Sequence, residues 1–552
     1  MLVKISCCLK WLLAAWCLAP SLSRANTSHP IPLRAVILID DAEALVHEGL
    51  STYNGVIIRS RSVPGNPSRL KKHLATALLG APIDGDTMKR GEEIIRTFYR
   101  KAGHPLVIVS VPEQKISQGT LQFVVRESRV DAIQYEGNRW FSTDQLKKQV
   151  RQPAGKPFNA NRMQKDLIWL NRNPFRETVL VLTPGTEEET TTLHLVSKDS
   201  FPYRIYFGAD NTGYRTTGLE RLFIGVHFGN LFKRDQRLSY RYTVSPRFGR
   251  FFAHTTQYVA PLPWRHILEL YGGYSGIRAI MPGSRQVSKG KAWQASLRYL
   301  IPLFPVQSYN HEITWGIDYK ETNVNLVLAA VPILGNNAVI TQAMCGYSAS
   351  LENPVADLSF GFEAFFSPGN IFRDQSSADF SSLRPDSKSS YTYVRAKFTP
   401  LFHLPHSLQL VVRSEFQVAS RNLLSSEQLG LGGLYTVRGY DERIVNADNG
   451  LFLLTELRSP PLRPLTKLFK KKSHELLQFL AFLDYGFGTN DKSVANERNY
   501  RYLLGTGVGA RYYYDYYVNA RVDVGYPLHR HIAPNITQPA GVKINFSAII
   551  GF

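Results

Sequence analysis

Cysteine is scarce in this chain. The sequence of 552 residues contains 4 cysteines, and Cys7, Cys8 and Cys17 lie close to its start. If the N-terminal segment is removed, Cys345 remains alone and no internal disulfide can form. Side-chain packing and strand pairing must then stabilise the fold.

Long hydrophobic runs are also lacking. The longest strongly apolar stretch, residues 11–20, is much shorter than the roughly 20 residues that a membrane-spanning helix needs. It follows the basic residues Lys4 and Lys10 and precedes the small-residue sequence Ser-Arg-Ala at positions 23–25. This order is typical of a secretory signal, so we predict one at residues 1–25, against the alternative of a buried N-terminal helix.

Acidic residues are outnumbered, with 44 Asp and Glu against 65 Lys and Arg, which gives a formal charge of +21. Such a balance raises the question of nucleic-acid binding. The cations are spread along the chain and often alternate with apolar residues, and the lysine run at 470–472 lies between strand patterns, where a solvated loop is expected. We therefore expect no nucleic-acid partner.

Catalytic signatures are absent as well. The sequence has no metal-spaced Cys or His cluster, no G-x-S-x-G and no phosphate-binding glycine loop. We expect no catalytic residues, no metal and no cofactor, and we do not expect an enzyme.

What the sequence does contain, from about residue 201 onward, is a hydrophobic pattern of period two. In residues 238–245 four apolar residues alternate with Ser, Arg, Thr and Ser, and similar alternation recurs in residues 408–418 and 518–526. Successive side chains of a strand point to opposite faces, so each segment predicts a strand with one apolar and one polar face.

A soluble β-sandwich would alternate in the same way, but three features favour lipid on the apolar side. The polar faces carry Arg, Glu and Asp in mid-strand, as a polar lumen requires. Aromatic residues gather at strand ends, as in residues 511–517, where a girdle would meet the membrane interface. A secretory signal without a helical span leaves a closed barrel as the other way to satisfy backbone groups in lipid. We predict a transmembrane barrel at 200–552 with about 16 antiparallel strands.

The region before residue 200 predicts two α+β modules, at residues 55–128 and 129–199, after an N-terminal segment at 26–54 with one short strand at 35–39. The first module combines helices at 67–79 and 86–102 with strands at 106–111 and 121–125. The second combines a strand at 130–135, a helix that begins at the N-cap Ser142, a helix at 161–172 and strands at 178–183 and 191–197.

Several motifs in these regions match a known family. They are Tyr135-Glu136-Gly137-Asn138, Leu170-Asn171-Arg172-Asn173-Pro174-Phe175 and Leu182-Thr183-Pro184-Gly185 in the second module, Gly208-Ala209-Asp210-Asn211-Thr212-Gly213 at the first barrel strand, and Asp235-Gln236-Arg237-Leu238. With them the chain resembles the two-partner secretion transporters, the TpsB proteins that export haemolysins and filamentous haemagglutinins, within the BamA-like superfamily. The first module, at residues 98–121, fits the family pattern less literally.

The most specific motif is Val437-Arg438-Gly439-Tyr440, followed downstream by Phe482-Leu483-Asp484-Tyr485-Gly486. The resemblance implies that the first motif lies on a loop around 430–450 that folds into the lumen, and that its arginine meets the carboxylate of the second motif on the barrel wall. An Arg fork and a carboxylate in a partly desolvated pore form a strong pair, and glycine lets the loop backbone approach the wall. Phe482, Asp484 and Gly486 form the expected wall partner.

The resemblance implies two periplasmic POTRA modules, a barrel in the bacterial outer membrane and a TpsA-like secreted exoprotein as the partner. We expect the modules to capture an unfolded exoprotein at a strand edge, with Ser142, Leu146 and Val150 as candidate contacts. Family members with an N-terminal plug helix have a longer segment than residues 26–54, so a plug helix is doubtful. An insertase, which usually has more modules, and a porin, which lacks modules and the Val-Arg-Gly-Tyr loop, are the alternatives.

The terminal strand pattern at residues 542–552 places apolar side chains, including Phe546 and Phe552, on one face. This resembles the signal by which outer-membrane barrels are recognised, so the expected partners also include the barrel assembly machinery during biogenesis and outer-membrane lipid.

Overall fold

The computed structural model describes residues 31–46, 53–60, 63–116, 118–280, 287–306, 308–322, 324–325, 331–332, 337–465, 474–493, 500–534 and 536–552. The predicted secretory signal at 1–25 and the lysine run at 470–472 lie outside these ranges. The chain divides into two compact units, one formed by Met1–Ala132 with Pro153–Ala160 and Pro184–Thr191, the other by the remainder. No helix in the described ranges is both long and apolar enough to cross a membrane.

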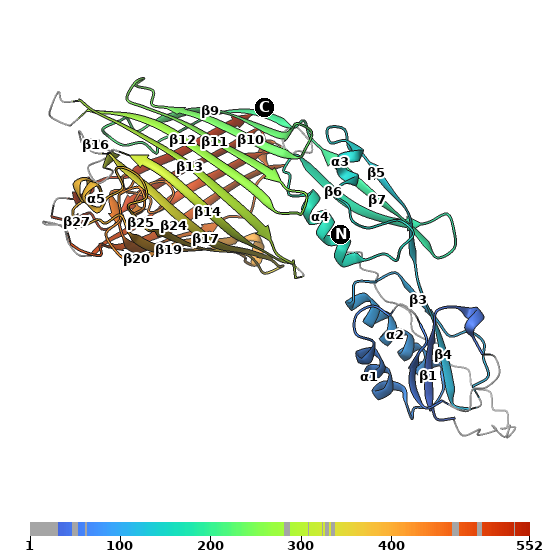
Figure 1. Ribbon diagram of the computed structural model, residues 1–552. Helices are drawn as coiled ribbons and strands as arrows, with labels where there is room; N and C mark the ends of the chain where they lie inside the picture. The colour runs from blue at the N-terminus through green and yellow to red at the C-terminus, as the bar shows by residue number, and fades with distance from the viewer. Residues whose placement is uncertain are drawn as a thin grey trace, which may run out of the picture. The chain divides into compact units, whose positions relative to one another are not determined.

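The first module is a sheet covered by two helices (Figure 1). Its elements are β1 Ala35–Ile39, a 3-10 turn at Ala42–Ala44, β2 Gly55–Ile58, α1 Pro67–Leu78, α2 Gly85–Lys101, β3 Val107–Ser110 and β4 Thr120–Glu127. The sheet order is β2-β1-β4-β3. Leu74 of α1 and Ile95 of α2 are buried with Phe123 of β4 in one core, so the apolar stripes of both helices pack on the same face of the sheet.

The first module begins earlier than the sequence suggested. β1 pairs in parallel with both β2 and β4, so Ala35–Ile39 belongs to this sheet and not to a separate segment ending at residue 54. All five β1 residues are buried, as expected of a central strand covered on both faces. The boundary at residue 55 was wrong because a parallel pairing joins strands far apart in the sequence.

The second module consists of β5 Arg129–Glu136, α3 Thr143–Lys147, α4 Ala160–Leu170, β6 Arg176–Pro184 and β7 Thr190–Asp199. Its sheet order is β5-β7-β6, which makes β6 an edge strand. The Ser142 side chain accepts a hydrogen bond from the Gln145 backbone N–H at the start of α3, the N-cap geometry predicted for this residue.

In the described part of the chain, 16 strands form one closed antiparallel barrel, which confirms the predicted fold (Figure 1). They are β8 Tyr203–Asp210, β9 Arg221–Leu231, β10 Gln236–Val244, β11 Phe251–Pro261, β12 Ile267–Ile280, β13 Val287–Pro302, β14 Tyr309–Thr322, β17 Ala338–Glu352, β18 Ala356–Ser367, β19 Tyr391–His403, β20 Gln409–Ala419, β23 Asn449–Arg458, β24 Glu475–Thr489, β25 Tyr500–Tyr514, β26 Val518–Pro527 and β29 Lys543–Gly551. β29 pairs with β8 and closes the ring.

The period-two pattern explains which side chains face outward. On β26, Val522 and Tyr526 are 44% and 43% exposed, whereas the intervening Asp523 is fully buried. The terminal strand repeats this, with Ile544 and Ile550 exposed and Asn545 buried. Apolar side chains therefore cover the outer wall and polar ones line the lumen, as in barrels that span a membrane.

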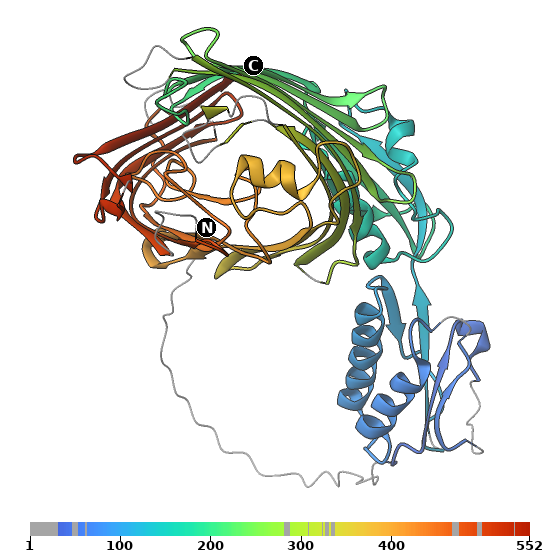
Figure 2. The ribbon, with the colours of Figure 1, turned by 60° about the vertical axis from the view of Figure 1, so that its left-hand side comes forward.

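Chain segments that connect strands lie inside the ring (Figure 2). They carry α5 Ser377–Leu383, between β18 and β19, and the short strands β21 Leu429–Leu431 and β22 Val445–Ala447, between β20 and β23. Other connections contain a 3-10 turn at Pro405–Ser407 and the short strand pairs β15 Val324–Asn325 with β16 Val331–Pro332 and β27 His531–Ala533 with β28 Ile536–Thr537. The lumen is therefore occupied by protein.

The two ends of the barrel are distinguished by chain direction. β8 begins directly after the second module, so we name the end at which β8 starts the proximal end and the opposite end the distal end. Tyr516 and Tyr517, in the proximal turn between β25 and β26, are half exposed and contact each other with ring centroids 4.2 Å apart. Exposed tyrosines at a barrel end are typical of an interfacial girdle.

Candidate functional site

The site is the long connection between β20 and β23, residues 420–448, which we name the plug loop. Both of its ends are at the distal end of the barrel, since β20 runs toward that end and β23 runs away from it. β21 and β22 pair as the stem of the plug loop, and the sequence Val437-Arg438-Gly439-Tyr440 lies beyond them. The plug loop thus enters the lumen from the distal side.

Arg438 is fully buried and forms a two-pronged pair with Asp484 of β24. Its Nε and Nη2 atoms donate to the two carboxylate oxygens, each at 2.7 Å, and its backbone N–H donates to the same carboxylate at 3.1 Å. Asp484 is also fully buried. A bidentate pair of this kind fixes orientation as well as position, because both groups are planar and fork-shaped.

Two further carboxylates meet the same guanidinium. Nη1 of Arg438 lies 2.6 Å from Glu456 of β23 and 3.3 Å from Asp523 of β26. Arg511 of β25 bridges these two carboxylates, at 2.7 Å from Glu456 and 2.8 Å from Asp523. The tip of the plug loop therefore inserts one cation into a charge network contributed by four adjacent strands, which compensates the desolvation of each charge.

Packing around Arg438 depends on an aromatic ring and on two glycines. The guanidinium lies over the Phe482 ring at 3.7 Å from its centroid. Gly439 has φ of +94°, and a Cβ there would lie 2.9 Å from the backbone of Tyr526. A Cβ at Gly486 would lie 2.8 Å from the Val437 side chain. Glycine is needed at position 439 because its φ is positive and the wall backbone is too close for a side chain, and at position 486 because the Val437 side chain occupies the space.

Tyr440 anchors the other side of the tip. Its hydroxyl lies 2.6 Å from the His529 carbonyl oxygen and accepts a hydrogen bond from the Leu504 backbone N–H at 3.1 Å. Its ring is buried together with Val437 in an apolar cluster that includes Leu503 and Ile532. The tip is thus held by packing as well as by charge.

A second anchor has the opposite polarity. Glu427, in the plug loop, is fully buried, and its carboxylate accepts hydrogen bonds from Lys320 of β14 at 2.8 Å and from the Tyr393 hydroxyl of β19 at 2.8 Å. Its backbone carbonyl accepts a hydrogen bond from Arg395 at 2.8 Å. Here the loop supplies the anion and the wall the cation, on strands other than those that hold Arg438.

A third contact ties the stem to the segment that carries α5. Arg384, just after α5, pairs with Asp448 at the end of the plug loop, with an N–O distance of 2.7 Å, and both side chains are buried. The plug loop therefore bonds to the wall and to a second lumenal segment.

The remaining residues predicted from the sequence are found elsewhere. Leu146 is buried in the core of the second module with Phe141 and Leu170, and Val150 packs against that core, so the structure gives both a packing role, and capture by them stays a prediction. Phe546 and Phe552 lie on β29 and at its end, remote in sequence from the plug loop.

Sequence reasoning missed Glu456, Arg511 and Glu427 as partners. Glu456 and Arg511 face inward on β23 and β25, but neither lies in a segment with a clear period-two pattern, so the only available signal was a charged residue in a largely apolar or aromatic segment. Such a signal does not show which charged residues on neighbouring strands contact each other. For Glu427 the sequence offered no signal, because the residue lies in a loop whose path depends on tertiary contacts.

The geometry defines a class of protein: a barrel of outer-membrane type whose lumen is closed by an anchored loop. Residues 189–512, more than half of the chain, match the family described as haemolysin secretion/activation protein ShlB/FhaC/HecB. The chain belongs to this family, and it is an outer-membrane transporter of two-partner secretion.

Known proteins agree with this assignment. The chain is 22% identical to the heme/hemopexin transporter protein HuxB of Haemophilus influenzae (strain 86-028NP) over 465 residues, which cover 79% of this chain and 76% of HuxB. It is 21% identical over 483 residues to the outer membrane transporter CdiB of Dickeya dadantii (strain 3937), covering 83% and 79%. The structure of CdiB from Escherichia coli superposes with a TM-score of 0.77 at 16% identity, covering 97% of this chain and 93% of that chain.

Proposed function

We propose that the two modules capture an unfolded exoprotein in the periplasm and that the barrel passes it outward after the plug loop moves aside. The observation that carries this proposal is the anchored loop in the lumen, because a pore built for free diffusion needs no such closure. The anchors are ion pairs, hydrogen bonds and side-chain packing between the plug loop and the wall, so the plug loop can leave the lumen without unfolding the wall.

The edge strand β6 is the proposed capture surface. Val179 and Val181 of β6 are about half exposed, at 49% and 46%. An extended segment that pairs with an open strand edge gains main-chain hydrogen bonds, and neighbouring apolar side chains add contact area. An unfolded exoprotein offers such segments, and its folding outside the cell would supply the free energy for transport.

The proposal assigns no catalytic step to the chain. Its family is one of transporters, and among the described residues no group of three or more His, Cys, Asp or Glu is arranged to hold a metal ion. The outward apolar wall would contact outer-membrane lipid, and the barrel assembly machinery would recognise β29 during biogenesis.

Deletion of residues 130–199 tests the capture step. We expect the deletion variant to insert a folded barrel but to secrete no exoprotein, with the exoprotein encoded in the neighbouring open reading frame as cargo. Secretion is measured by immunoblot of the culture medium, and barrel folding by heat-modifiable migration in gels.

A less invasive variant, Val181→Asp, keeps the second module and alters only the exposed edge. We expect secretion to fall severalfold, whereas the matched substitution Val355→Asp, at another exposed valine between β17 and β18, leaves it unchanged. Secretion at the wild-type level by the deletion variant would refute the capture role.

A further inference from the structure

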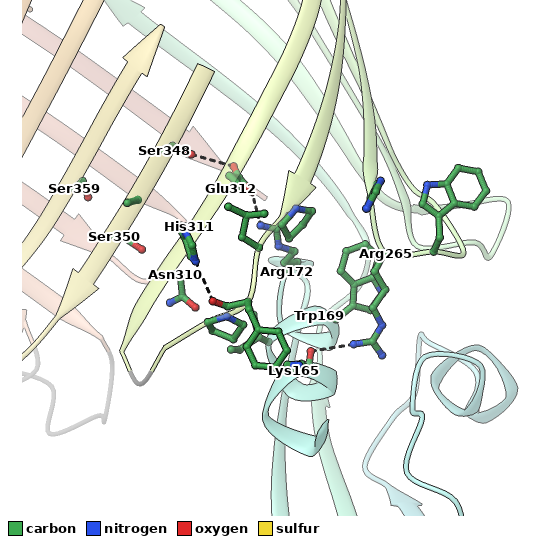
Figure 3. Close-up of a pocket in the computed structure, with 18 of the residues that line it drawn as sticks. Lys165, Trp169, Arg172, Arg265, Asn310, His311, Glu312, Ser348, Ser350 and Ser359 are labelled. Carbon is green, nitrogen blue, oxygen red and sulfur yellow. Dashed lines mark hydrogen bonds and ion pairs between the residues drawn. The ribbon is translucent and has the colours of Figure 1, made fainter. Parts of the chain in front are cut away.

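Helix α4 presents one face to the proximal end of the barrel wall (Figure 3). Lys165, Trp169 and Arg172 follow one another at intervals of four and three residues, which places them on a common face of the helix and its final turn. Arg172 pairs with Glu312 of β14 at 2.6 Å, and Trp169 packs against Val259 and Ile267 of β11 and β12. α4 is therefore docked on the barrel.

A cavity of about 730 Å³ lies between α4 and the proximal ends of β14, β17 and β18. Asn310 and Glu312 line it from β14 and share a strand face with Lys320, which reaches the plug loop in the lumen. Ser350 of β17 pairs with both Asn310 and Ser359 in strand register. Five lining residues of these strands share this lumenal face, namely Asn310, Glu312, Ser348, Ser350 and Ser359, while three lie on the opposite face, His311, Ala349 and Phe360. The barrel side of the cavity is thus formed mainly by the lumenal face of the wall.

Cations predominate in the cavity. Arg151, Lys165, Arg172 and Arg265 line it. Asp166, fully buried on α4, lies 3.0 Å from Arg151 and 2.7 Å from Arg265, while Glu312 is taken by Arg172. The ammonium group of Lys165 lies over the face of the Phe304 ring.

Burial, together with repulsion from Arg151 and Arg265, lowers the pKa of Lys165 below its usual value. The part of the shift that comes from Arg151 and Arg265 agrees with the predominance of cations around this side chain.

The remaining lining suits a polypeptide. Trp169, Trp264 and Phe304 offer aromatic surface, and Ser350 and Ser359 offer hydroxyls that can donate or accept hydrogen bonds. Aromatic walls with a few polar groups are typical of sites that bind organic ligands, and the volume falls in the usual range of about 300–1,000 Å³ for such sites.

We infer that this cavity, which we name the gateway site, receives an extended segment of the exported polypeptide that carries acidic and aromatic side chains, as the chain passes from the modules into the lumen. The inference rests on the proposed function and adds to it the location and the chemistry of the transfer step. The occupant is a polypeptide rather than a lipid, because the polar lining of these strands, Glu312 and the serines, lies on the lumenal face, whereas acyl chains would contact the face that carries Phe360.

Peptide binding tests the gateway site on the full chain in nanodiscs of phosphatidylcholine. The probe is a fluorescein-labelled ten-residue peptide of alternating Asp and Tyr, and its partner probe has Lys in place of Asp. We expect Lys165→Glu to weaken binding of the acidic peptide by at least about tenfold, because one charge near the ligand is reversed. Lys148→Glu makes the same charge change at an exposed site on the same module and should leave binding unchanged.

Other results would overturn the assignment. Equal binding of the acidic and the Lys-containing peptide, or equal loss in both variants, would contradict it. Displacement of the peptide by inorganic phosphate at equal concentration would show a simple anion site instead of a polypeptide site. Binding that appears only when phosphatidylglycerol is added to the nanodiscs would indicate a lipid surface and would also contradict it.

Crosslinking in cells separates this inference from the proposed function. With p-benzoylphenylalanine in place of Ser350, we expect an adduct with the neighbouring-gene exoprotein during export. The same amino acid in place of the outward-facing Ile317, which is 55% exposed, should give none. Two results together would overturn the gateway site and leave the proposed function standing. They are export by the wild type with no adduct at position 350, and full export by Lys165→Glu. Absence of export by the wild type would overturn the proposed function, while the peptide result would still decide the gateway site.

Discussion

At the scale of residues, the anchorage of Arg438 is distributed over three carboxylates. Asp484 binds it through two prongs, and Glu456 and Asp523 share its third nitrogen. Removal of Arg438 and removal of Asp484 should therefore differ in cost. Without Arg438 the network loses the only cation that the plug loop contributes to it, whereas without Asp484 the arginine still pairs with Glu456 and Asp523.

We expect Arg438→Ala to destabilise the docked plug loop by about 3–5 kcal/mol, the cost of removing one partner of a buried ion pair. Asp484→Asn should cost about 1–3 kcal/mol, because the amide oxygen still accepts one hydrogen bond. Single-channel recordings in planar bilayers measure how often the plug loop leaves the lumen. We expect more frequent openings for Arg438→Ala than for Asp484→Asn. Export should be impaired in the same order.

The control for this prediction is Arg421→Ala, which removes an exposed arginine from the same loop and should leave conductance unchanged. If Arg438→Ala and Asp484→Asn gave additive losses in the double variant, the two residues would act independently and the pairing would have no role in closure.

The sequence predicted the pair of Arg438 with Asp484 only through a motif, and it predicted neither Glu456 nor Arg511 as partners. None of the three wall residues lies in a segment with a clear alternation of apolar and polar residues, so only the charge of each residue indicated an inward orientation. Which inward residues meet depends on the register of β23, β24 and β25 relative to one another, and register is fixed by pairings along entire strands.

At the scale of elements, the plug loop is held at two places by charges of opposite sign. Glu427 meets Lys320 of β14, whereas Arg438 meets carboxylates on β23, β24 and β26. Because the two anchors use separate wall strands, each can be weakened while the other remains.

We expect Glu427→Gln to lose the ion pair with Lys320 but to keep the hydrogen bond from Tyr393, at a cost of about 1–3 kcal/mol to loop docking. Limited proteolysis of the plug loop in intact cells should proceed severalfold faster than in the wild type. Since the two anchors share no partner, the effects of Glu427→Gln and Arg438→Ala should add within about 0.5 kcal/mol.

The matched control is Glu363→Gln on β18, whose carboxylate accepts a hydrogen bond from Lys397 on the neighbouring wall strand at 2.9 Å. It should not change proteolysis of the plug loop. Proteolysis of Glu427→Gln at the wild-type rate would mean that this contact does not hold the loop.

The sequence predicted which segments of the two modules are helices and which are strands, but it did not predict which strands pair with one another. Residues 35–39 were expected as a strand and form one, yet their place between β2 and β4 followed from parallel pairings over a long sequence separation. Five consecutive apolar residues without alternation are the pattern of a strand buried on both faces, and this was the available signal.

At the scale of the whole molecule, closure of the barrel depends on the seam between β29 and β8. The Phe552 backbone N–H donates to the Ile205 carbonyl at 2.9 Å. The Asn211 side chain donates to the Ile544 carbonyl at 2.7 Å and accepts from the Phe546 N–H at 3.0 Å, so it extends the seam at the distal end. The strand number was predictable from length, but the role of Asn211 required the closed ring.

The terminal residue contributes both to this seam and to the outer apolar wall. The Phe552 ring is 68% exposed and lies edge-on to Phe207 of β8, with centroids 6.5 Å apart. We expect Phe552→Ser to lower the amount of folded barrel in the outer membrane severalfold, because an apolar terminal side chain is lost from the lipid-facing surface and from the strand that the assembly machinery is proposed to recognise. Phe552→Leu keeps an apolar side chain at this position and should retain most of the folded barrel.

Heat-modifiable migration and outer-membrane fractionation measure this effect. Phe248→Ser, at an exposed phenylalanine in the distal connection between β10 and β11, removes the same ring away from the seam and should leave the amount of folded barrel unchanged. Since serine keeps the backbone bonds of Phe552 to Ile205, a loss with Phe552→Ser and not with Phe552→Leu would assign the effect to the apolar side chain. Equal amounts of folded barrel in all three variants would show that the terminal ring has no role in assembly.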